Sequence, residues 1–185
     1  GLDFDNVELV GVLNADSMLK FPDFRALERS YQLMSQVAGR AGRKGDRGKV
    51  IIQTFDEKHE IIHQVKNHDY SSMCKKQLEE RKIFKYPPFC RIISVNLQHK
   101  NEQKLDNLSN KFAISLRKSF GNRVLGPESP GVSKIRNYYH KNILLKIETD
   151  ASITNAKNIL SSIIEKYKGL KDFRVLRINI DVDPY

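Results

Sequence analysis

The stretch CRIISVNLQ, residues 90–98, decides the fold of the second half of the chain. Its apolar and polar residues alternate, as they do in a strand with one buried face. The elements predicted after it are a helix at 102–120, a short strand that runs into a turn at 124–131, a strand at 142–149, a helix at 153–167 and a last strand at 173–182. This order predicts a ferredoxin-like split βαβ domain over residues 90–185, an α+β fold in which an antiparallel sheet carries two helices on one face.

The chain before this domain has the pattern of an α/β fold. The apolar run VELVGVL, residues 7–13, suits a buried parallel strand, and KVIIQTF, residues 49–55, suits a second one. Helices are predicted at 23–41 and 57–67. Two strands make an incomplete sheet, so we expect residues 1–68 to be the C-terminal part of a larger α/β lobe.

A joining segment, residues 69–89, is predicted between the two domains. It holds a helix from about residue 70 to residue 84, which ends at KYPPF because tandem prolines cannot continue a helix. The sequence starts at Gly1 rather than methionine, so we interpret it as a piece of a larger protein. Its apolar runs are far shorter than the ~20 residues that span a bilayer, and we expect no membrane contact.

The net charge of +10 lies in one part of the chain. Residues 1–68 carry ten Lys and Arg against ten Asp and Glu, whereas residues 69–185 carry 22 against 12. A basic surplus confined to one region favours a polyanionic partner, of which nucleic acid is the commonest. The alternative is a basic surface that only keeps the protein soluble.

The stretch QVAGRAGR, residues 36–43, is typical of a phosphate contact. Arg40 and Arg43 carry permanent charges on planar groups that match phosphate oxygens, and the neighbouring glycines let the backbone turn sharply. A helix that ends in this stretch fits an arginine finger, which stabilises the charge that develops in phosphoryl transfer. The alternative is an exposed basic loop.

QVAGRAGR resembles motif VI of superfamily-two helicases, and GLDFDNVELVGVLNAD, residues 1–16, looks like their motif V. The similarity is greatest to the family of replication-restart helicases called primosomal protein N′. It is carried by PDFRALERSYQLMSQVAGRAGR, IIQTF, YPPF, GP, ILLKI and DVDP, at residues 22–43, 51–55, 86–89, 126–127, 143–147 and 181–184. These motifs extend over essentially the whole chain.

The resemblance implies that residues 1–68 are the truncated second RecA-like lobe of a helicase. A first lobe outside this sequence would hold most of the ATP and Mg²⁺, because GxxxxGK[ST] is absent here. The resemblance assigns catalytic roles to Arg40, Arg43 and Gln36, and nucleotide-linked roles to Gly1, Asp3, Gly39 and Gly42. The 185-residue chain alone is expected not to hydrolyse ATP.

Metal binding is not expected in this chain. The family carries paired zinc-binding cysteines upstream of motif V, and Cys74 and Cys90 do not match them. The run HEIIH, residues 59–63, does fit the HExxH pattern of zinc proteases, with His59 and His63 as ligands and Glu60 as general base. We disfavour that interpretation because the motif alone occurs often by chance.

Two basic patches are candidate DNA contacts. The first lies in SKIRNYYHKN, residues 133–142, where cations alternate with aromatic rings: Lys134, Arg136, Tyr138, Tyr139 and Lys141. Cations suit backbone phosphates, and tyrosine rings can stack on unpaired bases. We expect only one of the two tyrosines to be exposed, with the other packed inward at the entrance to the strand. The second patch, RKIFKY at 81–86, offers Arg81 and Lys82.

The function predicted from these features is the C-terminal part of an ATP-dependent DNA helicase that recognises stalled replication forks and restarts replication. The family implies single-stranded and forked DNA, single-stranded DNA-binding protein and other primosome proteins as partners, in the bacterial cytoplasm at the nucleoid. The alternative is a stand-alone nucleic-acid or protein-interaction module without enzymatic activity.

Overall fold

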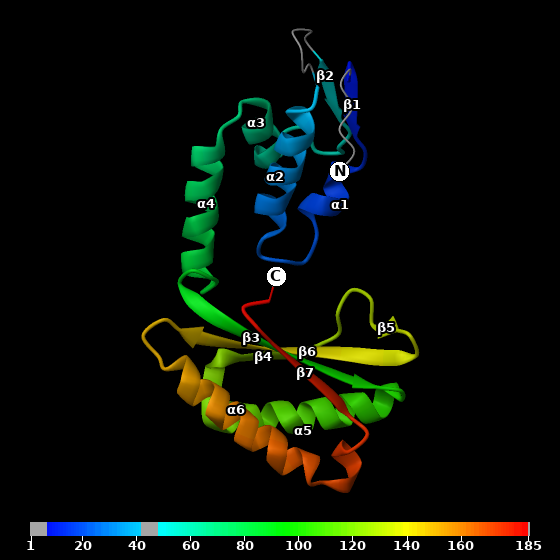
Figure 1. Cartoon of the computed structure of the whole chain (residues 1–185), viewed down its shortest axis with the longest axis vertical. Coiled ribbons are helices and arrows are strands. Elements are labelled where there is room, and N and C mark those ends of the chain that lie inside the picture. Colours follow the sequence, from blue (N-terminus) through cyan, green and yellow to red (C-terminus); the bar gives the residue numbers. More distant parts are fainter. Residues whose placement is uncertain (1–6, 42–47, 185) are drawn as a thin grey trace. The chain divides into compact units, whose positions relative to one another are not determined.

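The computed structural model describes residues 7–41 and 48–184 (Figure 1). It divides the chain into two compact units, Gly1–Ile83 and Phe84–Tyr185, and each is described by itself. Both units combine helices with a sheet, which confirms the expected mixture of α and β structure. The first unit includes the helix that was predicted in the joining segment.

In the described part of the first unit, two short parallel strands, β1 (Leu9–Val12) and β2 (Lys49–Ile52), pack against helices. The helices are α1 (Ala15–Leu19), α2 (Ala26–Ala38), α3 (Glu60–Lys66) and α4 (Tyr70–Ile83). Their apolar faces meet in a core that includes Tyr31, Met34, Ile61, Val65 and Met73. The other face of the strand pair is open, with Leu9 57% and Ile51 58% exposed.

The sequence did not reveal α1, because a five-residue helix directly after a strand is too short to show a helical repeat. Asn14, in the left-handed backbone conformation at φ 52°, ends β1 and turns the chain into this helix. α2 begins at Ala26 rather than at the predicted residue 23. The Asp23 carboxylate instead accepts a hydrogen bond from the Arg25 backbone N–H at 2.7 Å, in the turn before the helix.

The second unit is built on the antiparallel sheet β4–β6–β3–β7. Its strands are β3 (Cys90–His99), β4 (Val124–Glu128), β5 (Lys134–Ile135), β6 (Tyr138–Glu148) and β7 (Arg177–Val182). Two long helices, α5 (Glu102–Phe120) and α6 (Ile153–Lys168), cover one face of this sheet (Figure 1). Short 3₁₀ turns at Gly121–Arg123 and Lys171–Phe173 follow the two helices.

Polar caps fix where both helices begin. The Asn101 side chain accepts a hydrogen bond from the Lys104 backbone N–H at 2.9 Å, and Ser152 accepts one from Asn155 at 3.2 Å. The helices bury leucines and Phe112 against the helix-facing side of the sheet, where Val95 and Ile143 are fully buried. Side chains alternate across a strand, so the other face of the sheet carries a separate set of residues.

Two predicted strands of the second unit begin at other residues than expected. β6 begins at Tyr138 rather than 142, because the short strand Lys134–Ile135 folds back and pairs with Tyr138 and Tyr139. β7 begins at Arg177 rather than 173, since Phe173 and Leu176 turn into the core instead of continuing a strand.

Candidate functional site

The end of α2 places the arginine stretch. α2 ends at Ala38, and the Gly39 backbone N–H donates to the Ser35 carbonyl at 3.0 Å. Gln36 and Gly39 are exposed, and Arg40 follows directly with its side chain half-buried. A guanidinium at this position suits the negative end of the helix dipole. Four of the predicted nucleotide-linked residues lie outside the described residues: Gly1, Asp3, Gly42 and Arg43.

A hollow of about 320 Å³ opens where β1 and β2 end, lined by Asn14, Asp16, Gln53, Thr54 and Phe55. The Asp16 carboxylate accepts hydrogen bonds from the Phe55 backbone N–H at 2.9 Å and from the Thr54 hydroxyl at 3.3 Å. These bonds, the Phe55 bond first, lower the pKa of Asp16. Asp16 therefore joins the ends of the two strands, in addition to lining the hollow.

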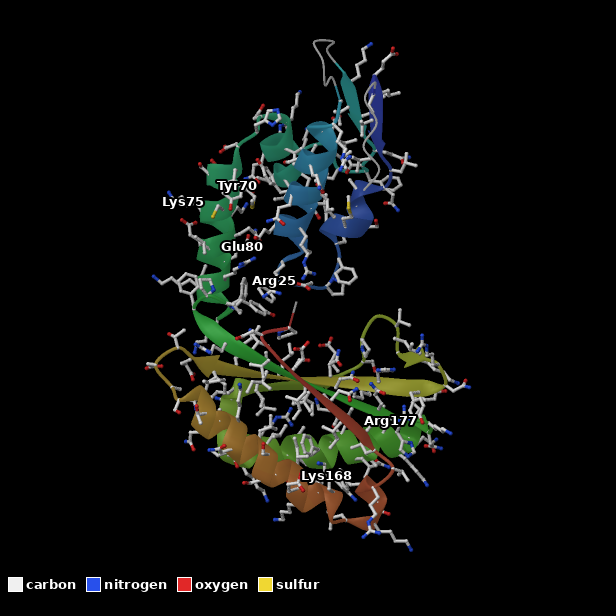
Figure 2. All side chains as sticks on the ribbon, viewed as in Figure 1. Arg25, Tyr70, Lys75, Glu80, Lys168 and Arg177 are labelled. Carbon is white, nitrogen blue, oxygen red and sulfur yellow. The ribbon has the colours of Figure 1, made fainter. Side chains whose placement is uncertain are left out.

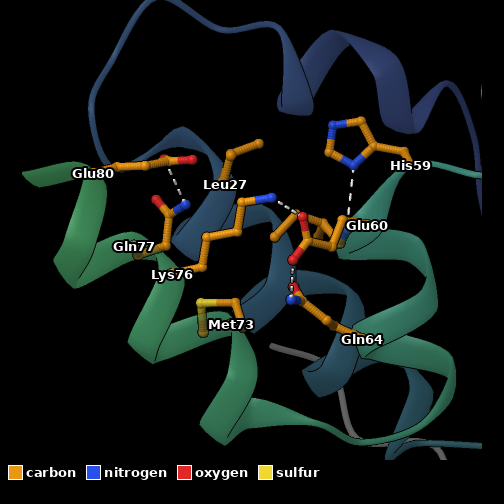
Figure 3. A pocket seen from close by; sticks show the side chains of 9 residues that line it. Leu27, His59, Glu60, Gln64, Met73, Lys76, Gln77 and Glu80 are labelled. Atoms are coloured by element: carbon orange, nitrogen blue, oxygen red, sulfur yellow. Dashed lines mark hydrogen bonds and ion pairs between the residues drawn. The ribbon is translucent and has the colours of Figure 1, made fainter.

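The HEIIH segment is occupied by structural contacts. His59 lies before α3, and its Nδ1 accepts a hydrogen bond from the Ile61 backbone N–H at 3.2 Å (Figure 3). Glu60 pairs with Lys76 and also accepts from Gln64, and the bond to Glu60 raises the pKa of Lys76. Within the residues that the structure describes, no three His, Cys, Asp or Glu side chains gather as metal ligands.

The two cations of the RKIFKY patch have different surroundings. Arg81 forms an ion pair with Glu28, its guanidinium lies over the Phe24 ring at 5.2 Å, and its side chain is only 14% exposed. Lys82 is exposed. Arg81 thus joins α4 to α2 inside the first unit. This pairing could not be predicted from sequence, because Glu28 lies 53 residues away.

The SKIRNYYHKN patch is a β-hairpin. β5 pairs with the start of β6, and Arg136 and Asn137 form its turn with φ 48° and 64°. A turn with two left-handed residues has the twist that joins neighbouring antiparallel strands tightly. Lys134 and Arg136 are exposed, and the Lys134 Nζ lies 4.8 Å from the Tyr139 ring centre.

The other predicted residues of this hairpin lie on opposite faces of the sheet. Tyr139 packs against the core, as one of the two tyrosines was expected to do, and Lys141 pairs with Asp106 of α5 at 2.8 Å. Tyr138 lies on the face away from the helices. There the Arg177 guanidinium sits 4.2 Å and the Lys100 ammonium 5.9 Å from its ring centre (Figure 2 labels Arg177). Sequence reasoning missed Arg177 and Lys100, because only the strand register brings them beside Tyr138.

The remaining motifs of the resemblance hold the second unit together. In YPPF, Tyr86 lies under Lys146 of ILLKI, whose Nζ is 3.6 Å from the ring centre. In DVDP, Asp183 accepts from the Ile92 backbone N–H at 3.1 Å, and its own N–H donates to the Ile92 carbonyl at 2.7 Å. In GP, Gly126 has φ +93°, and a Cβ there would lie 2.6 Å from the Asn142 carbonyl oxygen.

These placed motifs agree with the comparison to known protein families. Residues 82–185 match the family described as Primosomal protein N C-terminal domain. The chain belongs to this family. The resemblance found in the motifs is thereby confirmed, and the Primosomal protein N C-terminal domain corresponds to the second unit together with the last residues of α4.

Curated relatives extend the similarity along the rest of the chain. The Replication restart protein PriA of Bacillus subtilis is 36% identical over 187 residues, covering 100% of this chain and 23% of the relative. Proteins of the same name from Synechocystis sp. and Treponema pallidum are 34% and 33% identical, again over 100% of this chain and over 21% and 27% of their own lengths. The chain therefore spans about a quarter of the length of these relatives.

None of the helices that the structure describes combines the length and the apolar character of a membrane span.

Proposed function

We propose that this chain is the C-terminal part of an ATP-dependent DNA helicase that restarts replication at stalled forks. One observation carries the proposal: residues 82–185 belong to the Primosomal protein N C-terminal domain family, and the whole chain aligns with proteins named replication restart protein. The longer protein would act in the bacterial cytoplasm, with single-stranded DNA-binding protein and other primosome proteins as partners.

The first unit would be the end of the second RecA-like lobe. The parallel strands β1 and β2 beside helices support this assignment. Arg40 and Arg43 would stabilise charge on ATP held with Mg²⁺ by the first lobe, and Gln36 would sense the nucleotide. Gly1 and Asp3 would couple the nucleotide to the DNA, and Gly39 and Gly42 would take part in nucleotide binding. The placement of Gln36, Gly39 and Arg40 at the exposed end of α2 supports these roles.

The second unit would be a ferredoxin-like domain that contacts DNA. The strand order β4–β6–β3–β7 with both helices on one face supports the split βαβ assignment. Residues 84–185 carry 18 Lys and Arg against 9 Asp and Glu, so nearly all of the chain's surplus charge belongs to this unit. Lys134 and Arg136, exposed at the hairpin, are its most accessible predicted contacts, and the exposed Lys82 lies two residues before this unit in the chain.

DNA binding is tested with the 185-residue chain and fluorescently labelled single-stranded and forked oligonucleotides, by anisotropy at two salt concentrations. We expect the double variant Lys134→Glu/Arg136→Glu to bind about tenfold more weakly on both DNAs, with a shallower dependence on salt. The matched control, Lys157→Glu/Lys166→Glu, reverses two exposed charges on α6. Equal losses in both variants would show a general charge effect and contradict the hairpin contact.

The nucleotide role is tested in the longer protein that contains this sequence. Arg40→Ala should lower the DNA-stimulated ATPase rate by about a thousandfold, because an arginine finger contributes about 10³ to 10⁵ to kcat. DNA binding by the same variant should stay unchanged. Full ATP turnover in the variant would contradict the assignment.

A further inference from the structure

Three asparagines lie in one row across the sheet of the second unit. In the strand register, Asn96 of β3 stands opposite Asn142 of β6 on one side and opposite Asn179 of β7 on the other. Their neighbours along β3, Val95 and Leu97, point into the helix-covered core, so the asparagine row lies on the open face of the sheet. Asn179 is exposed, and Asn96 and Asn142 are half-buried.

The row has no evident role in folding. Asparagine is one of the residues that strands disfavour, and a solvent-facing row is normally filled by threonine, valine or aromatic residues, which stabilise the sheet. Three such residues aligned on central and edge strands are therefore a choice that strand propensity does not explain. Local choices that conflict with the fold are expected at functional sites.

The amides are ordered by hydrogen bonds among themselves. The Gln98 Nε2 donates to Asn96 Oδ1 at 2.7 Å, and the Asn96 Nδ2 donates to Asn142 Oδ1, also at 2.7 Å. This chain of bonds uses the oxygen and the nitrogen of the Asn96 amide, and it fixes the relative orientation of the Gln98, Asn96 and Asn142 amides, with the exposed Asn179 beside them on β7. An ordered set of amide donors and acceptors is suited to the edges of unpaired bases, which carry the same groups.

The two ends of the open face differ. At one end, Lys146 contacts the YPPF turn, donating to the Phe84 carbonyl at 2.8 Å, so the turn covers the face there. At the other end, the exposed Arg177 pairs in register with Gln98 and lies over Tyr138 beside Lys100. An arginine plane on a tyrosine ring is a surface on which a base can stack, and both cations can meet phosphates.

Acidic residues on the same face restrict where phosphates can lie. Glu128 stands opposite Asn142, and Asp181 lies two residues beyond Asn179 on β7. Their charges disfavour phosphates near the amides and near the covered end. The phosphates are therefore favoured at Lys100, Arg177 and the hairpin cation Arg136, with the bases directed onto the asparagine row.

We propose that the open face of this sheet binds unpaired DNA nucleotides, with the bases on the row Asn96–Asn142–Asn179 and on the Arg177–Tyr138 stack, and the phosphates at the cationic end. This inference rests on the proposed DNA binding of the second unit. It adds that the domain distinguishes DNA with unpaired bases from DNA without accessible ones. The contacts are to the amide and ring groups common to many bases, so little sequence preference follows.

The test compares three labelled ligands of equal length on the 185-residue chain: oligothymidine, an abasic strand that keeps only sugar and phosphate, and a blunt duplex. The variants are Asn96→Thr/Asn179→Thr, which introduces a residue that strands favour, and Arg177→Lys, which keeps the charge but removes the plane. Asn122→Thr, at an exposed position in the 3₁₀ turn after α5, is the matched control.

We expect both test variants to bind oligothymidine about five- to tenfold more weakly, because each removes a contact that only a base can make. Their affinity for the abasic strand and the duplex, and the salt dependence of binding, should match those of the parent and of the control. Unchanged affinity for oligothymidine, or an equal loss on the abasic strand, would overturn the inference. In either case, salt-dependent binding that is weakened by the hairpin charge reversals would leave the proposed function standing.

Discussion

The ammonium of Lys146 lies over the ring of Tyr86, with Nζ 3.6 Å from the ring centre. The same ammonium donates to the Phe84 carbonyl at 2.8 Å. One side chain of β6 therefore contacts both Tyr86, the first residue of YPPF, and the backbone two residues before it. Burial lowers the pKa of Lys146 and raises that of Cys90, whose thiol donates to the Lys85 carbonyl at 2.9 Å under this turn.

We expect Lys146→Met to loosen the turn and expose Cys90. The variant keeps most of the side-chain volume but loses the hydrogen bond and the cation–π contact, together worth about 1–3 kcal/mol. In a Cys74→Ser background, the thiol of Cys90 should react with a disulfide reagent about tenfold faster than in the parent. Lys157→Met, on the exposed side of α6, is the control and should leave the rate unchanged. A rate that stays at the parent value would contradict the anchoring role of Lys146.

Gly126 is expected to tolerate no side chain. Its φ of +93° is strained for other residues, and an added Cβ would come within 2.6 Å of the Asn142 carbonyl oxygen. Gly126→Ala should lower the free energy of unfolding of the second unit by about 2 kcal/mol or more, measured by urea denaturation. Gly131→Ala is the matched control, because nothing lies within 4 Å of its added Cβ. Similar midpoints for the two variants would refute the steric argument.

Arg81 is expected to act in stability and not in DNA binding. Arg81→Ala removes the partner of Glu28 and a contact with Phe24, and it should destabilise the first unit by about 1–3 kcal/mol. Lys82→Ala, the next residue and exposed, should change stability by less than about 0.5 kcal/mol.

A double-mutant cycle separates the ion pair from general effects on α4. Combining Glu28→Ala with Arg81→Ala should give a coupling free energy of about 0.5–3 kcal/mol in chemical denaturation. Additive effects would contradict a stabilising Glu28–Arg81 pair, and a loss of DNA affinity in Arg81→Ala without a loss of stability would restore Arg81 as a DNA contact.

The stability that Asp16 provides should depend on pH. Its pKa is lowered in the folded protein, so its contribution is present above the unfolded value of about 3.9 and is lost as the pH falls through the folded value. Asp16→Asn should therefore unfold at a lower temperature than the parent near neutral pH, and the difference should shrink toward about pH 3. A difference that stays constant with pH would mean that the ionised carboxylate is not what joins Phe55 and Thr54 to Asp16.

Periodic sequence predicts much of this fold. The bounds of α5 match the prediction at 102–120, because an apolar repeat follows the cap residue Asn101 and Gly121 ends it. The hairpin was harder to foresee, since β5 has only two residues and its turn, Arg136–Asn137, lacks glycine. Elements this short show no periodic pattern, so they become evident only from the strand pairing.

The same limit applies to the candidate sites. Charge and aromatic content identified the SKIRNYYHKN patch, but only the register assigns Tyr138 to the open face and turns Lys141 toward Asp106. Arg81 has the composition of a DNA contact and the surroundings of a structural ion pair. The asparagine row combines residues from three strands. In the sequence, each of these asparagines is one polar residue among many, and only the strand register shows that they are neighbours.

Tyr138 and Tyr139 are consecutive in the chain yet face opposite sides of the sheet, one under Arg177 and one against the core. The chain contains no tryptophan, so a single indole placed at either position would be the only strong fluorophore. At 138 its emission would report an occupant of the open face, and at 139 it would report the integrity of the interior. Two spectroscopic readouts, for ligand and for unfolding, are thus available one residue apart.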